Sequence, residues 1–274
     1  MFGTGGHTED VSCVRFGSDG TVLYSSSFED NLIQVWDWAT GSITQTLSGH
    51  TSPVNKVAVS PDGRTLASAS DDMSLKLWNL TSGTVMHTLN HTDAVRGVAW
   101  HPNCLQLATT GANGMLTYWT VDGELITSVL AIPNDNPVNS IPANGVAWSP
   151  DGLLVAVAGD DYIVRIYNAV TKDLVYELLG HYNKVYGVEF HKDSNMLLST
   201  SHDFRIFIWD MRLGTLLGEP LSGHYWGCEE ASFSPTDSHI VSVSDDKRVL
   251  LWDFQMVGPD MYIHGEQLVG TSGV

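Results

Sequence analysis

Short apolar runs recur along the whole chain and are separated by small and polar residues that favour turns. The stretch from Val54 to Leu89 is typical: VNKVAV, the turn SPDG, TLASAS, the turn DDMS, LKLWNL, the turn TSG and TVMHTL. Runs of this length, rich in Val, Ile, Leu and aromatic residues and bounded by Gly, Asp, Ser and Pro, predict four short β-strands. Because apolar residues occupy both faces of many of these strands, we expect neighbouring sheets to cover each sheet on both sides.

This four-strand pattern is one copy of an internal repeat that fills the chain. A Gly-His pair, or Asn-His in one copy, recurs and precedes a tryptophan by 28 or 29 residues. The histidines are His7, His50, His91, His181 and His224, and the tryptophans are Trp36, Trp78, Trp119, Trp209 and Trp252. A further copy reads NGVAWSPDGLLVAVAGDDYIVRIYN and has Tyr167 at the tryptophan position.

A four-stranded sheet of this size is not stable alone, so the six copies should stack, and radial stacking gives a β-propeller. The sequence therefore predicts an all-β protein with a single domain over residues 1–274 and six four-stranded blades. The blades are expected at about residues 6–48, 49–89, 90–131, 138–179, 180–222 and 223–269.

The repeated Gly-His, the aspartate six residues before the tryptophan, and Trp-Asp or a close variant resemble the WD40 repeat family over about residues 6–255. The resemblance implies the propeller fold and little about function, because one fold hosts unrelated roles. It also implies a hydrogen-bonded chain inside blade 2, made by His50, Asp72, Trp78 and a strand serine, which is Ser70 or, if the strand parity is shifted, Ser68. The corresponding structural residues are His181, Asp203 and Trp209 in blade 5 and His224, Asp246 and Trp252 in blade 6.

Blades 3 and 4 depart from the repeat. Blade 3 has Asn113 in place of the aspartate, and blade 4 has Asn139 and Tyr167 in place of histidine and tryptophan. The segment LAIPNDNPVNSIPAN ahead of blade 4 contains three prolines, so we expect it to form an exposed loop. We expect these two blades to be the more mobile part of the protein.

The sequence leaves open how the ends of the propeller meet. Little sequence precedes the first Gly-His pair to add a strand to the last blade, whereas MYIHGEQLV after Pro259 can form the outer strand of that blade. One interpretation is a closed six-bladed ring. The other is an open or seven-bladed ring whose gap or sheet edge is completed by a strand or blade from a partner chain, as in the coat and pore scaffold propellers that it resembles.

Composition limits the partners and the compartment. The chain has 274 residues with 31 acidic and 13 basic ones, a formal net charge of -18, which disfavours direct binding to nucleic acid and to membranes. The three cysteines, Cys13, Cys104 and Cys228, have neither metal-site spacing nor the density of a secreted disulfide scaffold. With no basic and apolar leader and no long apolar run, we expect a cytoplasmic protein, with the nucleus as the alternative.

The candidate binding surface is the blade end that carries the loop into the first strand and the turn after the second strand. The predicted protein-binding residues there are Asp10, Ser12, Glu29, Asn55, Asp71, Arg96, Asn144, Asp160, Lys184, Tyr186, His202, Trp226, Glu229 and Asp245. Carboxylates beside Tyr186 and Trp226 suit a basic side chain or a short basic peptide, through charge complementarity and cation–π contact. A solvated acidic rim without a partner is the alternative. In the propellers that the chain resembles, this end most often binds partners.

Motifs for catalysis are missing from the sequence: it contains no GxxxxGK[ST], HExxH, GxSxG or zinc-type cysteine cluster. The acidic turns DDMS and SDDK lack the alternating oxygen ligands of a calcium loop. We therefore expect no catalytic residue, cofactor or metal. The leading interpretation is a non-catalytic intracellular scaffold, a subunit of a multiprotein complex. The alternative is a substrate- or peptide-recognition module of a larger regulatory machine, and an enzyme built on a propeller is the third class.

Overall fold

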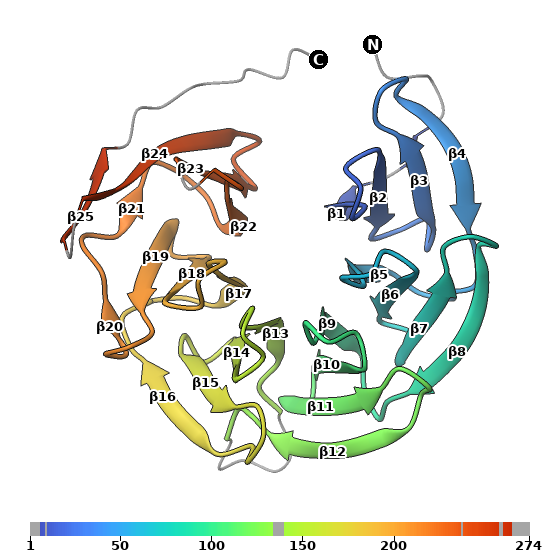
Figure 1. Ribbon diagram of the computed structural model, residues 1–274, viewed down its shortest axis with the longest axis horizontal. Helices are drawn as coiled ribbons and strands as arrows, with labels where there is room; N and C mark the ends of the chain where they lie inside the picture. The colour runs from blue at the N-terminus through green and yellow to red at the C-terminus, as the bar shows by residue number, and fades with distance from the viewer. Residues whose placement is uncertain (1–5, 9, 134–139, 237, 258–259, 265–274) are drawn as a thin grey trace. The chain divides into compact units, whose positions relative to one another are not determined.

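The computed structural model describes residues 6–8, 10–133, 140–236, 238–257 and 260–264, with side chains up to residue 253. All regular secondary structure in these ranges is β-strand. Contacts divide the chain into two compact units, Met1–Ala143 and Asn144–Val274, and each unit is described by itself. Figure 1 labels the strands in chain order, from blue to red.

Unit 1 contains three antiparallel four-stranded sheets, each built from consecutive strands. Blade 1 has the order β1-β2-β3-β4, blade 2 the order β5-β6-β7-β8, and blade 3 the order β9-β10-β11-β12. The strands are β1 (Val11–Phe16), β2 (Val22–Ser27), β3 (Ile33–Asp37), β4 (Ser42–Leu47), β5 (Val54–Val59), β6 (Thr65–Ser70), β7 (Ser74–Asn79), β8 (Thr84–Asn90), β9 (Val95–Trp100), β10 (Gln106–Gly111), β11 (Met115–Thr120) and β12 (Leu125–Leu130).

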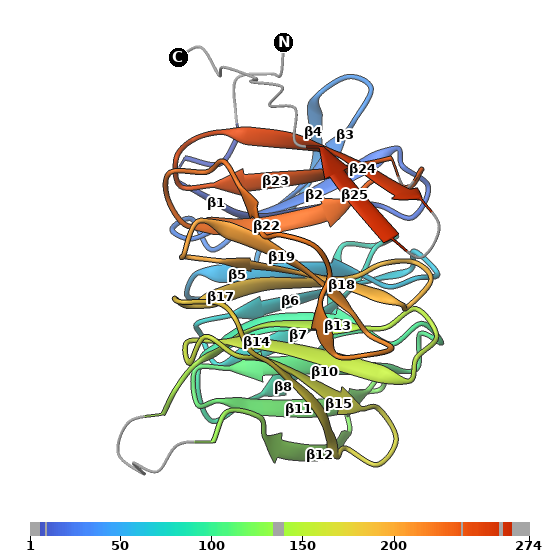
Figure 2. The ribbon, with the colours of Figure 1, turned by 90° about the vertical axis from the view of Figure 1, so that its left-hand side faces the viewer.

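Unit 2 contains blades 4, 5 and 6, with the orders β13-β14-β15-β16, β17-β18-β19-β20 and β22-β23-β24-β25. The strands are β13 (Ala143–Trp148), β14 (Leu154–Gly159), β15 (Val164–Asn168), β16 (Leu174–Leu178), β17 (Val185–Phe190), β18 (Met196–Ser201), β19 (Arg205–Asp210), β20 (Thr215–Leu216), β21 (Leu221–Ser222), β22 (Cys228–Phe233), β23 (His239–Ser244), β24 (Val249–Val257) and β25 (Asp260–His264). The two short strands β20 and β21 both pair with β19, and Figure 1 labels all three. They are separated by a segment that contains Pro220, which has no N–H to continue the ladder. Figure 2 shows β22, β23 and β24 of blade 6 from the side.

The SPDG sequences form the tight turns that join the first two strands of blades 2 and 4. In blade 2, Gly63 N–H donates to Ser60 O over 2.8 Å, and Ser60 Oγ donates to Asp62 over 2.6 Å. Gly63 has a φ of 70°, a left-handed conformation that favours glycine. The turn from Ser149 to Gly152 repeats this geometry in blade 4.

Adjacent blades within each unit bury their apolar faces against each other. We call the side of a blade that carries its tryptophan, or Tyr167 in blade 4, the tryptophan face. In unit 1 the tryptophan face of blade 2 packs against the opposite face of blade 1, and that of blade 3 against the opposite face of blade 2. In unit 2 the tryptophan faces of blades 5 and 6 pack in the same way against blades 4 and 5. Alternation of side chains across each strand lets one sheet supply both interfaces.

The six sheets confirm the predicted fold class, an all-β six-bladed β-propeller. The outer strand expected within MYIHGEQLV is β25, which pairs with β24. The remainder of that segment, Pro259, Asn139 and residues 134–139 of the proline-bearing loop lie outside the described residues. In the described ranges there is no helix with the length and apolar character needed to cross a membrane.

Candidate functional site

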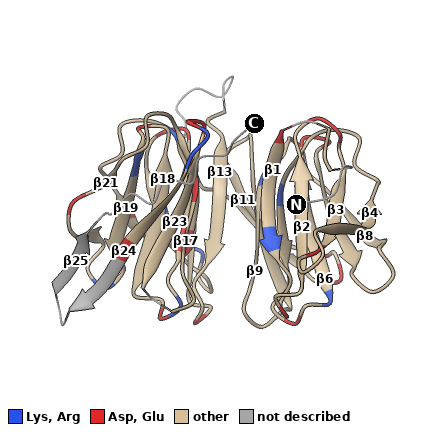
Figure 3. Ribbon diagram, turned by 90° about the horizontal axis from the view of Figure 1, so that it is seen from above, with Lys and Arg blue, Asp and Glu red and all other residues tan. Residues whose placement is uncertain are grey.

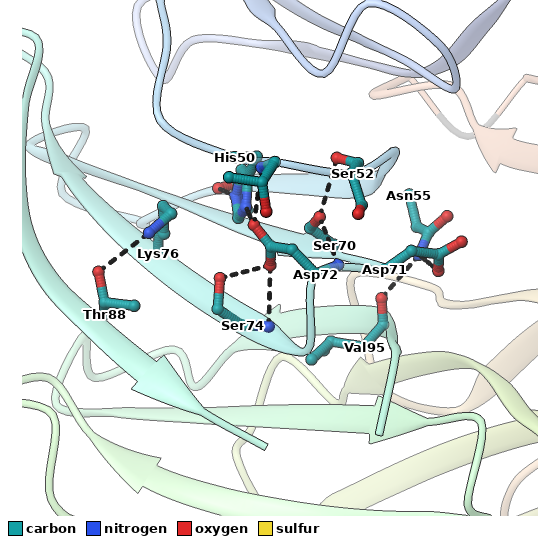
Figure 4. A network of polar contacts seen from close by, with 12 residues as sticks. His50, Ser52, Asn55, Ser70, Asp71, Asp72, Ser74, Lys76, Thr88 and Val95 are labelled. Carbon is teal, nitrogen blue, oxygen red and sulfur yellow. Dashed lines mark hydrogen bonds and ion pairs between the residues drawn. The ribbon is translucent and has the colours of Figure 1, made fainter. Parts of the chain in front are cut away.

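Four side chains of blade 2 form a continuous hydrogen-bonded chain from the buried sheet to the loop end. Trp78 Nε1 donates to Ser68 Oγ over 2.8 Å, and Ser68 Oγ donates to His50 Nε2 over 2.7 Å. His50 Nδ1 donates to the Asp72 carboxylate over 2.7 Å, the contact seen at the centre of Figure 4. The directions follow from the chemistry, because an indole can only donate and a serine hydroxyl has one proton to give. The indole N–H of Trp78, the hydroxyl of Ser68 and both ring nitrogens of His50 thereby have partners.

Ser70, the first choice for this chain, lies outside it and was wrong, whereas the alternative, Ser68, is the serine that the structure shows. The Ser70 hydroxyl donates to Ser52 O over 3.1 Å and accepts from the Asp72 amide over 3.1 Å. Two residues apart, Ser68 and Ser70 share one face of β6, so strand parity does not distinguish them. The register pairs Leu66 with Trp78. On the same face of β6, Ser68 is the next residue after Leu66, and Ser70 is the one after that, farther from the indole. Distance along the strand therefore selects Ser68.

The same set of contacts is present in blades 1, 5 and 6, with donor–acceptor distances of 2.6–2.9 Å. The residues are Trp36, Ser25, His7 and Asp30 in blade 1; Trp209, Ser199, His181 and Asp203 in blade 5; and Trp252, Ser242, His224 and Asp246 in blade 6. Each chain ties the loop before the first strand to the turn after the second strand.

Blade 3 keeps the chain in a shortened form. Thr109 takes the serine's place and lies 2.9 Å from His91 and 3.1 Å from Trp119. His91 Nδ1 donates to the backbone carbonyl of Leu89 over 3.1 Å, and Asn113 instead donates to Thr92. A backbone carbonyl thus replaces the carboxylate.

Blade 4 uses a different buried cation. Arg165 donates to Asp161 over 2.6 Å and to Glu177 over 3.1 Å, and its side chain is buried. Sequence reasoning missed this residue, although an arginine in an otherwise apolar strand, four residues after the turn aspartate, is a usable signal. A buried guanidinium needs carboxylate partners. In blade 4, Arg165 pairs with Asp161, the aspartate whose counterpart in four other blades accepts from a histidine.

The Asp–His–Ser geometry does not form a reaction centre. Ser68 has no exposed surface, so a substrate carbonyl has no access to its hydroxyl. The hydroxyl of Ser68 donates to His50 and its oxygen accepts from Trp78. Both contacts hold the hydroxyl inside the sheet, whereas a serine nucleophile must face the substrate. The arrangement is repeated in four blades, which fits a structural role.

Burial and hydrogen bonds shift the pKa values of two histidines and three aspartates in these chains. Burial is the largest influence on His50 and His91 and lowers the pKa of both imidazoles below the usual 6.5. For Asp72, burial opposes ionisation, but hydrogen bonds, including the one from His50, outweigh it and lower the pKa below 3.8. The same balance lowers the pKa of Asp203 and Asp246.

The free energy of unfolding should therefore fall in two stages as the pH decreases. A histidine with a lowered folded pKa binds fewer protons in the fold than in the unfolded chain, so stability is lost as the pH falls below 6.5. An aspartate with a lowered folded pKa contributes stability that is lost below 3.8, as the pH passes its folded value. Urea titrations across this range measure both stages. Unchanged stability between about pH 7 and about pH 5 would contradict the first stage.

At the loop ends of unit 1, several predicted binding residues form contacts inside the unit. Ser12 Oγ donates to the carbonyl of Val54, and Asn55 donates to Val95 O over 2.8 Å, so each side chain joins its blade to the next. Asn55 also donates to Asp71 over 2.7 Å (Figure 4).

An ion pair lowers the negative charge that unit 1 presents to a basic partner. Arg96 lies 3.5 Å from Asp71, so a cation already stands beside that carboxylate. Asp10 and Glu29 are exposed.

In unit 2, Asn144 and Asp160 have equivalent internal partners. Asn144 donates to Val185 O over 3.1 Å and to Asp160 over 2.8 Å. Lys184 Nζ lies 2.6 Å from Asp160 and neutralises it. That hydrogen bond raises the pKa of Lys184, so the lysine remains charged.

The other predicted residues of unit 2 form what we call the Tyr186 patch: Tyr186, His202, Trp226, Glu229 and Asp245. The Tyr186 and His202 rings meet edge to face with centroids 5.9 Å apart, and His202 Nε2 lies 3.9 Å from Asp245. Gly227 makes room for this histidine, because a Cβ there would lie 1.9 Å from the imidazole. Burial, and then the charge of Glu229, raises the pKa of Tyr186. The patch therefore combines aromatic rings with a negative potential.

Asp and Glu positions, red on the ribbon in Figure 3, are concentrated in the loops at the strand ends. The described residues include no group of three or more His, Cys, Asp or Glu placed to hold a metal ion. Cys13, Cys104 and Cys228 are all free thiols.

Comparison with known proteins covers most of the chain. A family model described as "WD domain, G-beta repeat" matches residues 2–37, 41–79, 83–120, 133–168, 172–210 and 214–253. The p21-activated protein kinase-interacting protein 1-like of Danio rerio is 30% identical over 220 residues, covering 78% of this chain and 57% of that protein. Nuclear distribution protein PAC1-2 of Uncinocarpus reesii is 31% identical over 216 residues, 76% of this chain and 41% of that protein.

Periodic tryptophan protein 2 of Arabidopsis thaliana is 27% identical over 248 residues, 76% of this chain and 28% of that protein. The chain thus spans between 28% and 57% of the length of these relatives. Six matched repeats in a chain whose described residues form six antiparallel sheets show that the protein belongs to the WD40 repeat family.

Proposed function

We propose that this protein is a non-catalytic scaffold whose Tyr186 patch binds a basic segment of a partner protein. WD40 propellers typically serve as protein-interaction scaffolds, and the name of the Danio rerio relative describes a protein that interacts with a kinase. The observation that carries the proposal is the exposed indole of Trp226, 62% accessible, in the loop just before β22, the strand that carries Glu229. The carbonyl of Trp226 accepts from Ser244, the residue next to Asp245. An exposed aromatic ring beside carboxylates favours lysine and arginine side chains.

The proposed compartment is the cytoplasm, with the nucleus as the alternative. Three free cysteines fit a reducing environment, and the printed name of the Uncinocarpus reesii relative refers to nuclear distribution. No cofactor is part of this proposal, and the net charge of -18 argues against direct nucleic-acid binding.

Charge reversal at the patch tests the proposal. Combining Glu229→Lys with Asp245→Lys should weaken binding of a short arginine-rich peptide by about tenfold or more, because attraction becomes repulsion. Fluorescence polarisation at low and high salt measures the affinity, and wild-type binding should weaken as salt rises.

A matched control combines Asp173→Lys with Glu219→Lys, two exposed positions in other loops of unit 2, and makes the same change in net charge. This control should retain most of the affinity. Equal losses in both double variants would show that overall charge, and not the Tyr186 patch, attracts the peptide.

The alternative function, a substrate-recognition module of a larger regulatory machine, would use the same patch. Cross-linking mass spectrometry on native extract distinguishes the two. A scaffold gives one stoichiometric complex whose cross-links reach the patch, whereas a recognition module gives many short-lived clients.

A further inference from the structure

Blade 3 contains a pocket of about 240 Å³ on its tryptophan face. We call it the Thr117 pocket, and its lining includes His91, Met115, Thr117, Trp119, Leu125 and Ser128. Every lining residue lies between Asn90 and Ser128, so the pocket belongs to unit 1 alone. Leu125 and Ser128 are exposed, so solvent reaches the pocket at its edge. An apolar cavity of roughly 150 Å³ holds benzene, so this pocket has room for a six-membered ring.

A small side chain at position 117 explains the pocket. Thr117 lies opposite Thr109, the hydroxyl residue of the hydrogen-bonded chain in blade 3. The residues opposite the corresponding position in the other five blades are all larger: Gln34, Lys76, Arg165, Phe207 and Leu250. Because threonine is shorter than any of them, blade 3 leaves open a space beside its histidine that a long or bulky side chain fills in the other blades.

Blade 5 shows that an aromatic ring fits this space. Phe207 stacks on the imidazole of His181, with ring centroids 4.0 Å apart and planes 25° apart, and it is buried. Blade 3 has the same kind of histidine and tryptophan, since the rings of His91 and Trp119 lie 4.9 Å apart, but it has no phenylalanine between them and solvent. A ring bound in the Thr117 pocket therefore takes the place that Phe207 has in blade 5.

The polar groups of the pocket favour a neutral ring that carries a hydroxyl group. Ser128 Oγ donates to Thr117 Oγ1 over 3.0 Å, and its remaining lone pairs can accept from a hydroxyl of a ligand. The two carboxylates that hold Arg165 in blade 4 have Asn113 and Ser128 as their counterparts in blade 3, so a bound cation lacks those partners. Asp93, which also lines the pocket, accepts from the amide of Ala94.

We propose that the Thr117 pocket binds a phenol ring, carried either by a small free phenol or by a tyrosine side chain of a partner. The ring stacks on His91 and contacts the apolar side chains of the lining, and its hydroxyl bonds to Ser128. The pocket lies in unit 1 and the Tyr186 patch in unit 2. The two proposals use different residues and opposite chemistry, a neutral ring and a basic segment, so either can fail without the other.

Isothermal titration calorimetry with p-cresol tests the pocket. The wild-type protein should show saturable binding at one site below about 10 mM ligand, a range that reaches millimolar dissociation constants. Thr117→Phe should weaken this binding about tenfold or more, because its own ring fills the pocket as Phe207 does in blade 5. Thr81→Phe is the matched control, at an exposed turn position of unit 1 outside the pocket, and should bind like the wild type. Circular dichroism checks the fold, and Thr117→Leu, which introduces the residue type that blade 6 has here, serves if Thr117→Phe does not fold.

Methyl NMR of the methionines locates the bound ring. The Met115 signal should shift as p-cresol is added, since Met115 lines the pocket, whereas the signal of Met73, exposed in a turn of blade 2, should not. Ser128→Ala should weaken p-cresol binding about three- to tenfold, the effect of one hydrogen bond. The same variant should leave toluene binding unchanged, because toluene has no hydroxyl to donate.

Titration with N-acetyltyrosinamide distinguishes the two sources of the ring. Binding as tight as that of p-cresol assigns the pocket to a tyrosine side chain, and weaker binding assigns it to a small free phenol. Absence of saturable p-cresol binding to the wild-type protein would overturn the proposal. It would also be overturned if a folded Thr117→Phe or Thr117→Leu variant bound like the wild type, or if the Met115 signal did not respond.

Discussion

Replacing Trp78 with alanine should lower the free energy of unfolding by about 3–5 kcal/mol. The indole is 1% exposed, packs in the cluster between blades 1 and 2, and donates to Ser68. Removing it leaves a cavity and takes away the donor that orients the serine hydroxyl, so the apolar and polar losses add.

Trp226→Ala is the matched control for this prediction, because the same side chain is removed from an exposed site. Its effect on stability should stay within about 0.5 kcal/mol. Urea unfolding followed by far-ultraviolet circular dichroism measures both variants. Equal destabilisation of the two variants would show that the buried position of Trp78 and its hydrogen bond add nothing to the free energy of unfolding.

Replacing Gly145 with alanine should cost about 1–3 kcal/mol through overpacking. A Cβ at this position would lie 2.4 Å from the carbonyl oxygen of Tyr186. That neighbour is the backbone of β17, so a side-chain rotation cannot relieve the clash, and β13 and β17 must move apart. The displacement acts on the strand that carries Tyr186, so the variant should also weaken peptide binding at the patch.

Gly17→Ala is the control, since the nearest atom to its Cβ would be Val22 O at 3.4 Å, an ordinary contact. This variant should be neutral or stabilised by up to about 1 kcal/mol, because alanine restricts the unfolded chain. Thermal unfolding compares the two. A Gly145→Ala protein as stable as Gly17→Ala would contradict the close approach of blades 4 and 5.

Repetition explains why so much of the fold was predictable. The spacing from His50 to Trp78 recurs because each blade must connect the same loop, strands and turn. These connections involve residues close together in the sequence, so a sequence pattern reveals them. The choice between Ser68 and Ser70 was not predictable in the same way, since both lie on one face of β6 and only the pairing of Leu66 with Trp78 distinguishes them. Arg165 was missed because the carboxylate of Glu177 reaches it across the strand pair.

The candidate site was predictable as a set of positions but not as a set of available side chains. The repeat places Asn55 and Tyr186 at the same kind of position. Asn55, however, bonds to the backbone of the next blade, whereas Tyr186 lies in a patch with His202 and acidic neighbours. The partner of Asn55 is Val95, 40 residues away, and no periodic pattern specifies the contact.

The sequence by itself determined the all-β class, the six blades and the histidine, aspartate and tryptophan of each complete hydrogen-bonded chain. These features depend on alternation, turn chemistry and spacing within one repeat, which are local properties of the chain. Only the tertiary structure decided which serine completes the chain and which rim residues join neighbouring blades within each unit. Those outcomes depend on contacts between residues a whole repeat apart, where the packing of one sheet on the next sets the distances.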